Sequence, residues 1–260
     1  MPNRPSLFRR LTRPFLTAVM FLTRIPCPAW VTHAPADLAR STVYFPVVGI
    51  LVGGVGAGVF WSVRLLWPPF IAVVAALAAG VWVTGAFHED GLADTVDGFG
   101  GGWTPEDVLS VMKDSRIGTF GVVALLFVLV AKGAALVALN PAGAAWALIA
   151  GHVLGRWSSL PLIWQYDYVR DNSATVPPAA ATITPARLAV GTVVAVGVVM
   201  LGLGQRALPV LGGAVLVTGL CGVVFRRRIG GITGDTLGAA NQLVELSTYL
   251  LLAAEMPAVP

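Results

Sequence analysis

The chain has 260 residues, of which 56% are hydrophobic and only 12% are charged, and its mean hydropathy is +0.79. Soluble domains carry about a quarter charged residues, so this composition excludes an ordinary globular surface. The formal net charge of +4 does not indicate nucleic acid as a partner, because the distribution of the charges explains it better. The two cysteines, Cys27 and Cys221, offer neither a metal-site spacing nor a disulfide framework.

The N-terminal arm, residues 1–40, is basic and partly apolar. Within it Met1–Arg24 mixes arginines with leucine, phenylalanine and methionine, and lacks the continuous apolar core of a cleaved signal peptide. This mixture predicts an amphipathic helix that lies on anionic membrane lipid.

Seven apolar segments follow along the chain. They are Tyr44–Trp67, Pro69–Phe87, Gly118–Leu139, Ala142–Trp164, Leu188–Gly204, Ala207–Phe225 and Leu237–Ala254. A spanning helix needs about 20 mostly apolar residues. The sequence therefore predicts an all-α fold, a polytopic integral membrane helical bundle of about seven spans, in one domain over residues 1–260. The seventh segment contains Asn241, Gln242 and Glu245, so it must be shielded from lipid if it spans.

The basic residues predict the orientation of these spans. With the N-terminus in the cytoplasm, thirteen of the 17 basic residues fall on that side, and only Arg64 and Arg206 fall on the other. Such a bias marks the cytoplasmic side of a membrane protein. We therefore expect a multi-pass protein of the cytoplasmic (inner) membrane. Its acid-bearing loops, including residues 88–117, would open on the cytoplasm.

The polar segment after the second apolar stretch carries the strongest chemical signal. Seven of the 13 acidic residues lie within residues 89–114. On a helix, Asp90, Asp94 and Asp97 are spaced i, i+4 and i+7 and share one face. Carboxylates so close together repel each other unless a cation lies among them. Oxygen ligands without a nearby thiolate favour Mg²⁺ or Mn²⁺ over zinc. The simpler alternative is a solvated acidic loop.

Two neighbours extend this candidate metal site. Glu89 is a further candidate ligand, and His88 is a candidate substrate contact, with a plain interfacial side chain as its alternative. The run ends in four glycines within residues 98–102, which is unusual for a merely solvated loop.

A second polar stretch, Met112–Gly121, alternates acid and base at the start of the third apolar segment. Lys113 and Arg116 are candidates for binding phosphate oxygens. The alternative is ordinary anchoring of basic residues at the cytoplasmic face.

A third polar stretch precedes the seventh segment. Gly231, Thr233 and Gly234 belong to a Gly-Gly-x-Thr-Gly-Asp run at an expected helix start, where exposed backbone N–H groups favour phosphate. Gln242 and Glu245 carry polarity into the span, and embedded polar groups of this kind are usually functional. We therefore take these five residues as candidate substrate contacts.

Two basic residues lie inside apolar segments. Arg156 needs an anion, for which a carboxylate and a substrate phosphate are both open. Lys132 lies nearer the outer half of its segment, where snorkelling explains it as well as function does.

These stretches together resemble the cobalamin synthase family, the adenosylcobinamide-GDP ribazoletransferases of the vitamin B12 pathway. The resemblance rests on Phe21–Pro26, Tyr44–Gly49, His88–Gly102, Lys113–Gly121, Gly155–Trp157 and Gly231–Gly238 with Gln242 and Glu245, in this order along the chain. It implies a membrane-bound, Mg²⁺-dependent enzyme. The substrates would be adenosylcobinamide-GDP and α-ribazole or its 5′-phosphate, and the products adenosylcobalamin or its 5′-phosphate and GMP.

The resemblance and the chemistry of the residues together suggest roles for the candidates. The proposed metal ligands are Asp90, Asp94, Asp97 and Glu89, the proposed phosphate contacts are Lys113, Arg116 and Arg156, and the general base is either Asp114 or Asp235. Phosphoryl transfer requires positioning and charge neutralisation more than covalent help from the protein.

Two other classes of protein remain as alternatives. Asp94 and Asp97 begin an Asp-x-x-Asp-Gly pattern typical of CDP-alcohol phosphatidyltransferases, but the rest of that signature is missing. An ion-coupled transporter would need acids at mid-membrane depth in paired spans, whereas these acids cluster at one face. A homo-oligomer is left open.

Overall fold

The computed structural model describes residues 7–32, 34–169 and 183–254, and all regular elements in this part of the chain are helical. The predicted apolar segments form α3 (Phe45–Arg64), α4 (Pro69–Thr84), α7 (Thr119–Val137), α8 (Pro141–Gln165), α9 (Pro185–Leu203), α10 (Ala207–Ile229) and α11 (Gly234–Ala253). The remaining helices are α1 (Leu7–Leu22), α2 (Pro35–Ser41), α5 (Phe87–Gly101) and α6 (Pro105–Val111), with 3₁₀ turns at Thr42–Tyr44 and Gly204–Arg206. Each of the seven segments is thus confirmed as a helix, with ends moved by at most four residues.

Local sequence explains where several helices begin. Pro69, Pro141 and Pro185 occupy the first turns of α4, α8 and α9, where a missing N–H costs nothing. The Asn140 side chain accepts a hydrogen bond from the N–H of Gly143, and so caps α8.

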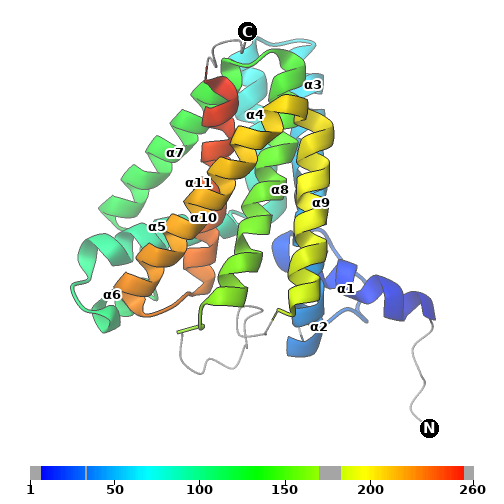
Figure 1. The fold of residues 1–260 in the computed structure, drawn as a ribbon. Helices are drawn as coiled ribbons and strands as arrows, with labels where there is room; N and C mark the ends of the chain where they lie inside the picture. Colours follow the sequence, from blue (N-terminus) through cyan, green and yellow to red (C-terminus); the bar gives the residue numbers. More distant parts are fainter. Residues whose placement is uncertain (1–6, 33, 170–182, 255–260) are drawn as a thin grey trace.

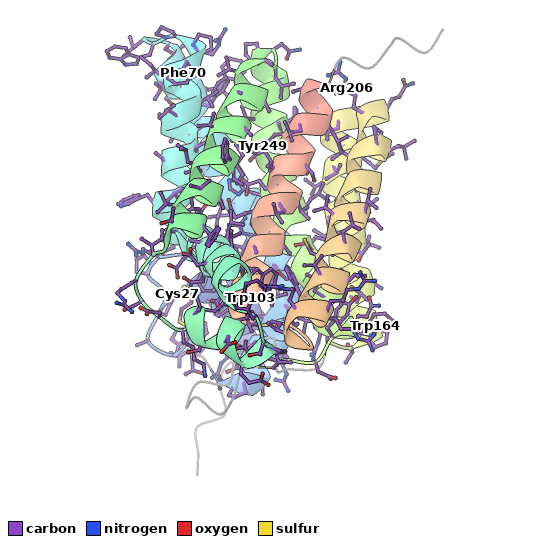
Figure 2. All side chains as sticks on the ribbon, turned by 90° about the vertical axis from the view of Figure 1, so that its left-hand side faces the viewer. Cys27, Phe70, Trp103, Trp164, Arg206 and Tyr249 are labelled. Carbon is purple, nitrogen blue, oxygen red and sulfur yellow. The ribbon has the colours of Figure 1, made fainter. Side chains whose placement is uncertain are left out.

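The helices form an elongated bundle with two different ends (Figure 1). One end, which we call the polar end, is formed by α1, α2, α5, α6 and the link between α10 and α11. The links α3–α4, α7–α8 and α9–α10 lie at the opposite end, as does the last turn of α11. Figure 2 accordingly shows Cys27, Trp103 and Trp164 at the polar end, and Phe70 and Arg206 at the other. The polar stretches of the sequence therefore meet at one end of the bundle.

Helix α8 lies in the middle of the bundle and approaches α3 through glycine. A Cβ atom added at Gly49 would lie 2.5 Å from the carbonyl oxygen of His152, and one at Gly53 would lie 2.6 Å from the Cα of Ile149. Only glycine permits this contact between backbones, which is common in membrane bundles. By contrast, Gly54 in the same run has nothing within 4 Å of its added Cβ.

The second predicted span ends in a sharp corner. Helix α4 stops at Thr84, and α5 begins at Phe87 at an angle of 88° to it. Gly85 and Ala86 both adopt left-handed backbone angles at the corner, with φ of 69° and 60°. The expectation that residues 88–117 form a loop is therefore wrong, because most of them belong to the helices α5 and α6. The helical spacing assumed for the three aspartates is confirmed.

By length and composition alone, fewer stretches qualify as membrane spans than the seven helices that the apolar segments form. Three stretches are long and apolar enough to cross a membrane, namely Pro35–Arg64, Thr119–Val137 and Pro185–Ile229, and α4 with α5 makes a fourth if the bent pair counts as one. The stretch Pro185–Ile229 contains two helices, α9 and α10, that turn back on each other at Gly204, where φ is 55° (Figure 1). The seven-span count stays a prediction.

Helix α1 agrees only in part with the predicted interfacial helix. Its first half leaves the bundle and exposes Leu7, Phe8 and Leu11 (Figure 1). Its second half is buried in the bundle, with Ala18 and Val19 at 0% and 4% exposure. Only the first half of α1 can therefore lie on a membrane surface. Arg4 lies outside the described residues.

Candidate active site

The acidic helix α5 crosses α11 at the polar end through two glycines. A Cβ at Gly91 would lie 2.8 Å from the carbonyl oxygen of Asp235 and 3.2 Å from the Cα of Gly238. At its other end, the Arg228 guanidinium donates hydrogen bonds to the carbonyl oxygens of Phe99 and Gly102. These contacts fix the acidic helix against α10 and the start of α11, and they bring the backbone of Asp235 against Gly91, the neighbour of Asp90 in the chain.

Asp97 holds the start of α7. Its carboxylate accepts hydrogen bonds from the backbone N–H groups of Gly118, at 2.7 Å, and Gly121, at 2.8 Å. A Cβ at either glycine would lie 2.4 Å from a carboxylate oxygen, so both positions must lack a side chain. A carboxylate at a helix N-terminus also compensates the helix dipole. Asp97 therefore has a structural role that the sequence did not predict.

The three aspartates of α5 do not lie in one common environment. Asp90 is exposed, Asp94 is half-buried and Asp97 is buried. Among the described residues no three His, Cys, Asp or Glu side chains come together as a group that could hold a metal ion. The three-carboxylate site is therefore not formed by the side chains themselves. Asp90 and Asp94 still lie one turn apart, and Mg²⁺ is commonly bound by one or two carboxylates with substrate phosphates.

A network of buried polar side chains extends from α5 into the bundle. Lys132 on α7 donates to Gln242 at 2.6 Å and to Glu245 at 3.0 Å, and Gln242 donates to Glu89 at 3.1 Å. Lys132 is 1% exposed, so the alternative of a snorkelling lysine is wrong. Glu89 of the acidic helix is thus tied through Gln242 to the core, and its second carboxylate oxygen, Oε2, is buried with no hydrogen-bond partner among the described residues.

The network continues onto α8. The Tyr249 hydroxyl donates to Glu245 at 3.0 Å, and Nδ1 of His152 lies 3.2 Å from the other oxygen of Glu245. Nη1 of Arg156 donates to the His152 carbonyl oxygen at 3.1 Å and also lies 3.2 Å from Nδ1 of His152, which joins Arg156 to the network. Figure 2 shows Tyr249 between the labelled ends of the bundle. Glu245 is the twelfth residue of α11 and lies about 17 Å along the helix axis from the start of α11 at the polar end.

Arg156 and Asn241 keep polar atoms without partners in this interior. Nε of Arg156 and both side-chain polar atoms of Asn241 are buried and make no hydrogen bond within the described part of the chain. Asn241 packs against Gly155, whose added Cβ would lie 3.0 Å from its oxygen. Buried polar groups of this kind normally hold water or a ligand. Nε of Arg156 is thus left for an anion, and the two alternatives for it, a carboxylate and a substrate phosphate, both stay predictions.

The start of α11 is less open than the sequence suggested. The Thr233 hydroxyl accepts from the N–H of Thr236, and the Thr236 hydroxyl accepts from the N–H of Thr233, which closes a capping box. Gly231 lies against the carbonyl of Asp167, where its added Cβ would be only 2.2 Å away. Thr233 and Gly231, both predicted as substrate contacts, therefore have structural roles. Gly234 lines a cavity of about 50 Å³ with His88, which is buried.

The second polar stretch lies in the open at the polar end. Arg116 forms two parallel hydrogen bonds to Asp114, Nη2 to Oδ2 at 2.6 Å and Nε to Oδ1 at 3.0 Å. Hydrogen bonds from the Arg116 side chain and backbone lower the pKa of Asp114 from 3.8 to about 2. The pair borders a cleft of about 490 Å³ that also reaches Asp97 and Gly118. Lys113 nearby is exposed.

Sequence reasoning missed Lys132, His152 and Tyr249 as members of the buried network. Lys132 is the one charged residue of α7, whereas His152 and Tyr249 lie on helices that carry other polar side chains, so the sequence contained no sign that the three belong together. Their partners are 4 to 113 residues away along the chain, so only the folded bundle identifies the network.

These features define an all-helical protein with candidate membrane spans, an acidic helix at one end and a charged network beneath it. Comparison with known proteins is more specific. The chain belongs to the cobalamin-5-phosphate synthase family, whose model matches residues 14–253.

Three relatives named adenosylcobinamide-GDP ribazoletransferase are similar over most of their length. The protein of Shewanella frigidimarina is 45% identical over 244 residues, which covers 92% of this chain and 94% of the relative. Those of Shewanella baltica and Shewanella putrefaciens are each 43% identical over 242 residues, covering 92% of both chains. No solved structure matches the chain.

Proposed function

We propose that this protein joins α-ribazole, or its 5′-phosphate, to adenosylcobinamide-GDP and releases GMP, in the assembly of cobalamin. Membership of the cobalamin-5-phosphate synthase family over residues 14–253 carries this proposal. The names of the similar proteins supply the reaction. The meeting of the three polar stretches at one end of the bundle agrees with it, because a two-substrate transfer needs both substrates in one cleft.

The membrane arrangement is part of the proposal. The seven helices would cross the cytoplasmic membrane with the polar end, and hence the active site, on the cytoplasmic side. The basic residues gathered at that end support this orientation. Reporter fusions at Gly101 and beyond the end of α11 test it, since they should report opposite sides. The same side for both would contradict seven spans.

The phosphate contacts would come from the polar end and the interior. Arg116 and Lys113 are exposed beside the cleft, where guanidinium and ammonium groups could bind pyrophosphate oxygens. Arg156 would bind an anion that enters the bundle from the polar end, because its buried Nε has no hydrogen-bond partner in the part of the chain that the structure describes. Arg116 is paired with Asp114, so it would have to exchange this carboxylate for the substrate phosphate.

Of the two candidates for the general base, Asp114 and Asp235, we favour Asp235. A base works best when its pKa lies near the working pH, and the pKa of Asp114, about 2, is far below it. Asp235 is half-buried at the crossing of α5 and α11, next to the acids of the proposed metal site. We assign it the proton of the attacking ribazole hydroxyl.

Mg²⁺ is the proposed cofactor. Asp90 and Asp94 would hold it together with the phosphates of the substrate, since Asp97 already caps α7. When bound, the ion would neutralise charge on the departing GMP. Glu89, tied to Gln242, would keep α5 in place beneath this site.

Transfer would be direct, without a covalent protein intermediate. Neither cysteine belongs to the polar stretches. The hydroxyls of Thr233 and Thr236 are occupied by the capping box. A single displacement inverts the configuration at phosphorus. A chiral thiophosphate analogue of the substrate tests this, because net retention would require two displacements.

The alternatives lose support. The family match does not favour a CDP-alcohol phosphatidyltransferase. The acid at mid-bundle depth, Glu245, is paired with Lys132, as a structural ion pair would be. Radiolabelled corrinoid incubated with membranes that contain the protein separates the classes, because an enzyme converts the label and a transporter only moves it.

A further inference from the structure

A second polar cleft lies at the polar end, between α1 and the segment that leads into α2. Its volume is about 530 Å³, and its charged and aromatic lining consists of Arg9, Arg13, Trp30, Asp37 and Arg40. In Figure 1, α1 and α2 lie on the opposite side of the polar end from α5 and α6. The cleft is therefore separate from the candidate active site.

The lining is strongly basic. Three arginines face one carboxylate, and Asp37 is already bound to Arg13 at 2.8 Å and to the Thr32 hydroxyl at 3.1 Å. Arg40 is exposed and has no carboxylate partner among the described residues. The cleft thus keeps positive charge that its own acid does not neutralise.

Contacts with neighbouring side chains hold two of the arginines of this cleft in fixed positions. Nη2 of Arg13 donates to both Asp37 and Thr32, which ties α1 to α2. The guanidinium of Arg9 lies 5.6 Å from the ring centre of Trp30, a cation–π contact. Nε of Arg13 is buried without a hydrogen-bond partner within the described part of the chain. Two of the arginines are therefore held in position, as a phosphate site requires.

Exposed apolar side chains border this basic cleft. Leu7, Phe8 and Leu11 are 70%, 70% and 66% exposed, and lie within an arc of about 100° on α1. Leu7 and Leu11 also line the cleft. A soluble phosphate or nucleotide would leave these side chains in water. An amphiphile would cover them with its chains and place its head in the cleft.

We propose that this cleft binds the phosphate head of an anionic phospholipid, with the acyl chains against Leu7, Phe8 and Leu11. The site would attach the first half of α1 to the membrane surface and select anionic over zwitterionic lipid. This selection goes beyond the general attraction of basic helices to anionic membranes, because it depends on one arginine more than on net charge.

The test uses the full-length protein, purified and delipidated in an uncharged detergent. Phosphatidylglycerol and phosphatidylcholine are titrated separately, with binding read by native mass spectrometry and by the shift in unfolding temperature. We expect tighter binding of phosphatidylglycerol. Arg40→Gln should weaken it about fivefold, which is the usual contribution of one basic residue near an anionic headgroup, and leave phosphatidylcholine unchanged.

The matched control is Arg206→Gln, which removes one exposed arginine at the opposite end of the bundle. It should leave phosphatidylglycerol binding unchanged. An equal loss in both variants would overturn the proposal, because the effect would then be one of net charge. Displacement of the lipid by inorganic phosphate at equal concentration would also overturn it, since the ligand would then be a soluble anion.

Discussion

The Nζ atom of Lys132 lies 3.0 Å from a carboxylate oxygen of Glu245, and both side chains are only 2% exposed. The two residues belong to α7 and α11, which flank the acidic helix α5 in the bundle. Gln242, which also accepts from Lys132, connects this pair to Glu89 of α5. The buried charges therefore hold together the three helices that support the candidate site.

Removal of one partner of this pair should destabilise the protein strongly. In Lys132→Met the carboxylate of Glu245 stays buried and loses its ammonium partner, which typically costs about 3 kcal/mol. Denaturant unfolding in detergent measures this loss. Lys113→Met is the matched control, because Lys113 is exposed. Equal stability of the two variants would contradict the buried ion pair.

Substitution of Asp97 should lower the stability of the protein, whereas substitution of Asp90 should not, although both are acids of the same helix. Asp97→Asn presents an amide N–H toward one of the two backbone N–H groups at the start of α7, and should cost about 1–3 kcal/mol of stability as well as activity. Asp90→Asn should abolish activity and leave stability unchanged, because Asp90 is exposed.

Unfolding curves and the rate of GMP release are measured on the same preparations. Glu106→Gln serves as the control, since Glu106 lies on α6 in solvent and should be nearly neutral in both assays. An Asp97→Asn protein that is inactive yet fully stable would show that the cap is not the role of this residue.

The crossing of α5 and α11 should tolerate no side chain at Gly91. Gly91→Ala places a methyl group 2.8 Å from the carbonyl oxygen of Asp235, so the helices must separate, at a cost of about 1–3 kcal/mol. Gly101→Ala on the same helix meets only Val111, at 3.8 Å. The unfolding temperature should fall for the first variant alone. A neutral Gly91→Ala would mean that the helices pack less closely.

The pairing of Asp114 with Arg116 makes a prediction about pH. Because the folded-state pKa is lowered from 3.8 to about 2, the contribution of the pair is complete above about pH 4 and is lost as the pH falls toward 2. Asp114 therefore does not titrate between about pH 5 and 9. Asp114→Asn should lower the rate of GMP release without moving the pH profile in that range. A limb of the profile that disappears in this variant would identify Asp114 as the base.

The fold could be predicted well where hydrophobicity alone decides it. Long apolar runs identified α3, α4 and α7 to α11, and prolines such as Pro141 and Pro185 marked where helices begin. The corner at Gly85 and Ala86 could not be predicted, because the left-handed conformation of Ala86 has no sequence signal and depends on the packing of α5.

The candidate site could be predicted only in outline. The i, i+4, i+7 spacing located the acidic face of α5 correctly. It could not reveal that Asp97 caps a helix whose first residues are more than twenty positions away. In the same way, Lys132 could be read as snorkelling until Glu245, 113 residues later, was found beside it. Long-range pairing is decided by the packing of whole helices.

One assay tests the central claim most directly. Purified full-length protein is incubated with adenosylcobinamide-GDP, α-ribazole and Mg²⁺, and GMP is measured as a function of time. We expect GMP and a cobalamin product in equal amounts, only when both substrates are present, and none with Asp90→Asn. Release of GMP without α-ribazole, or a cobalamin product formed without GMP, would contradict the account.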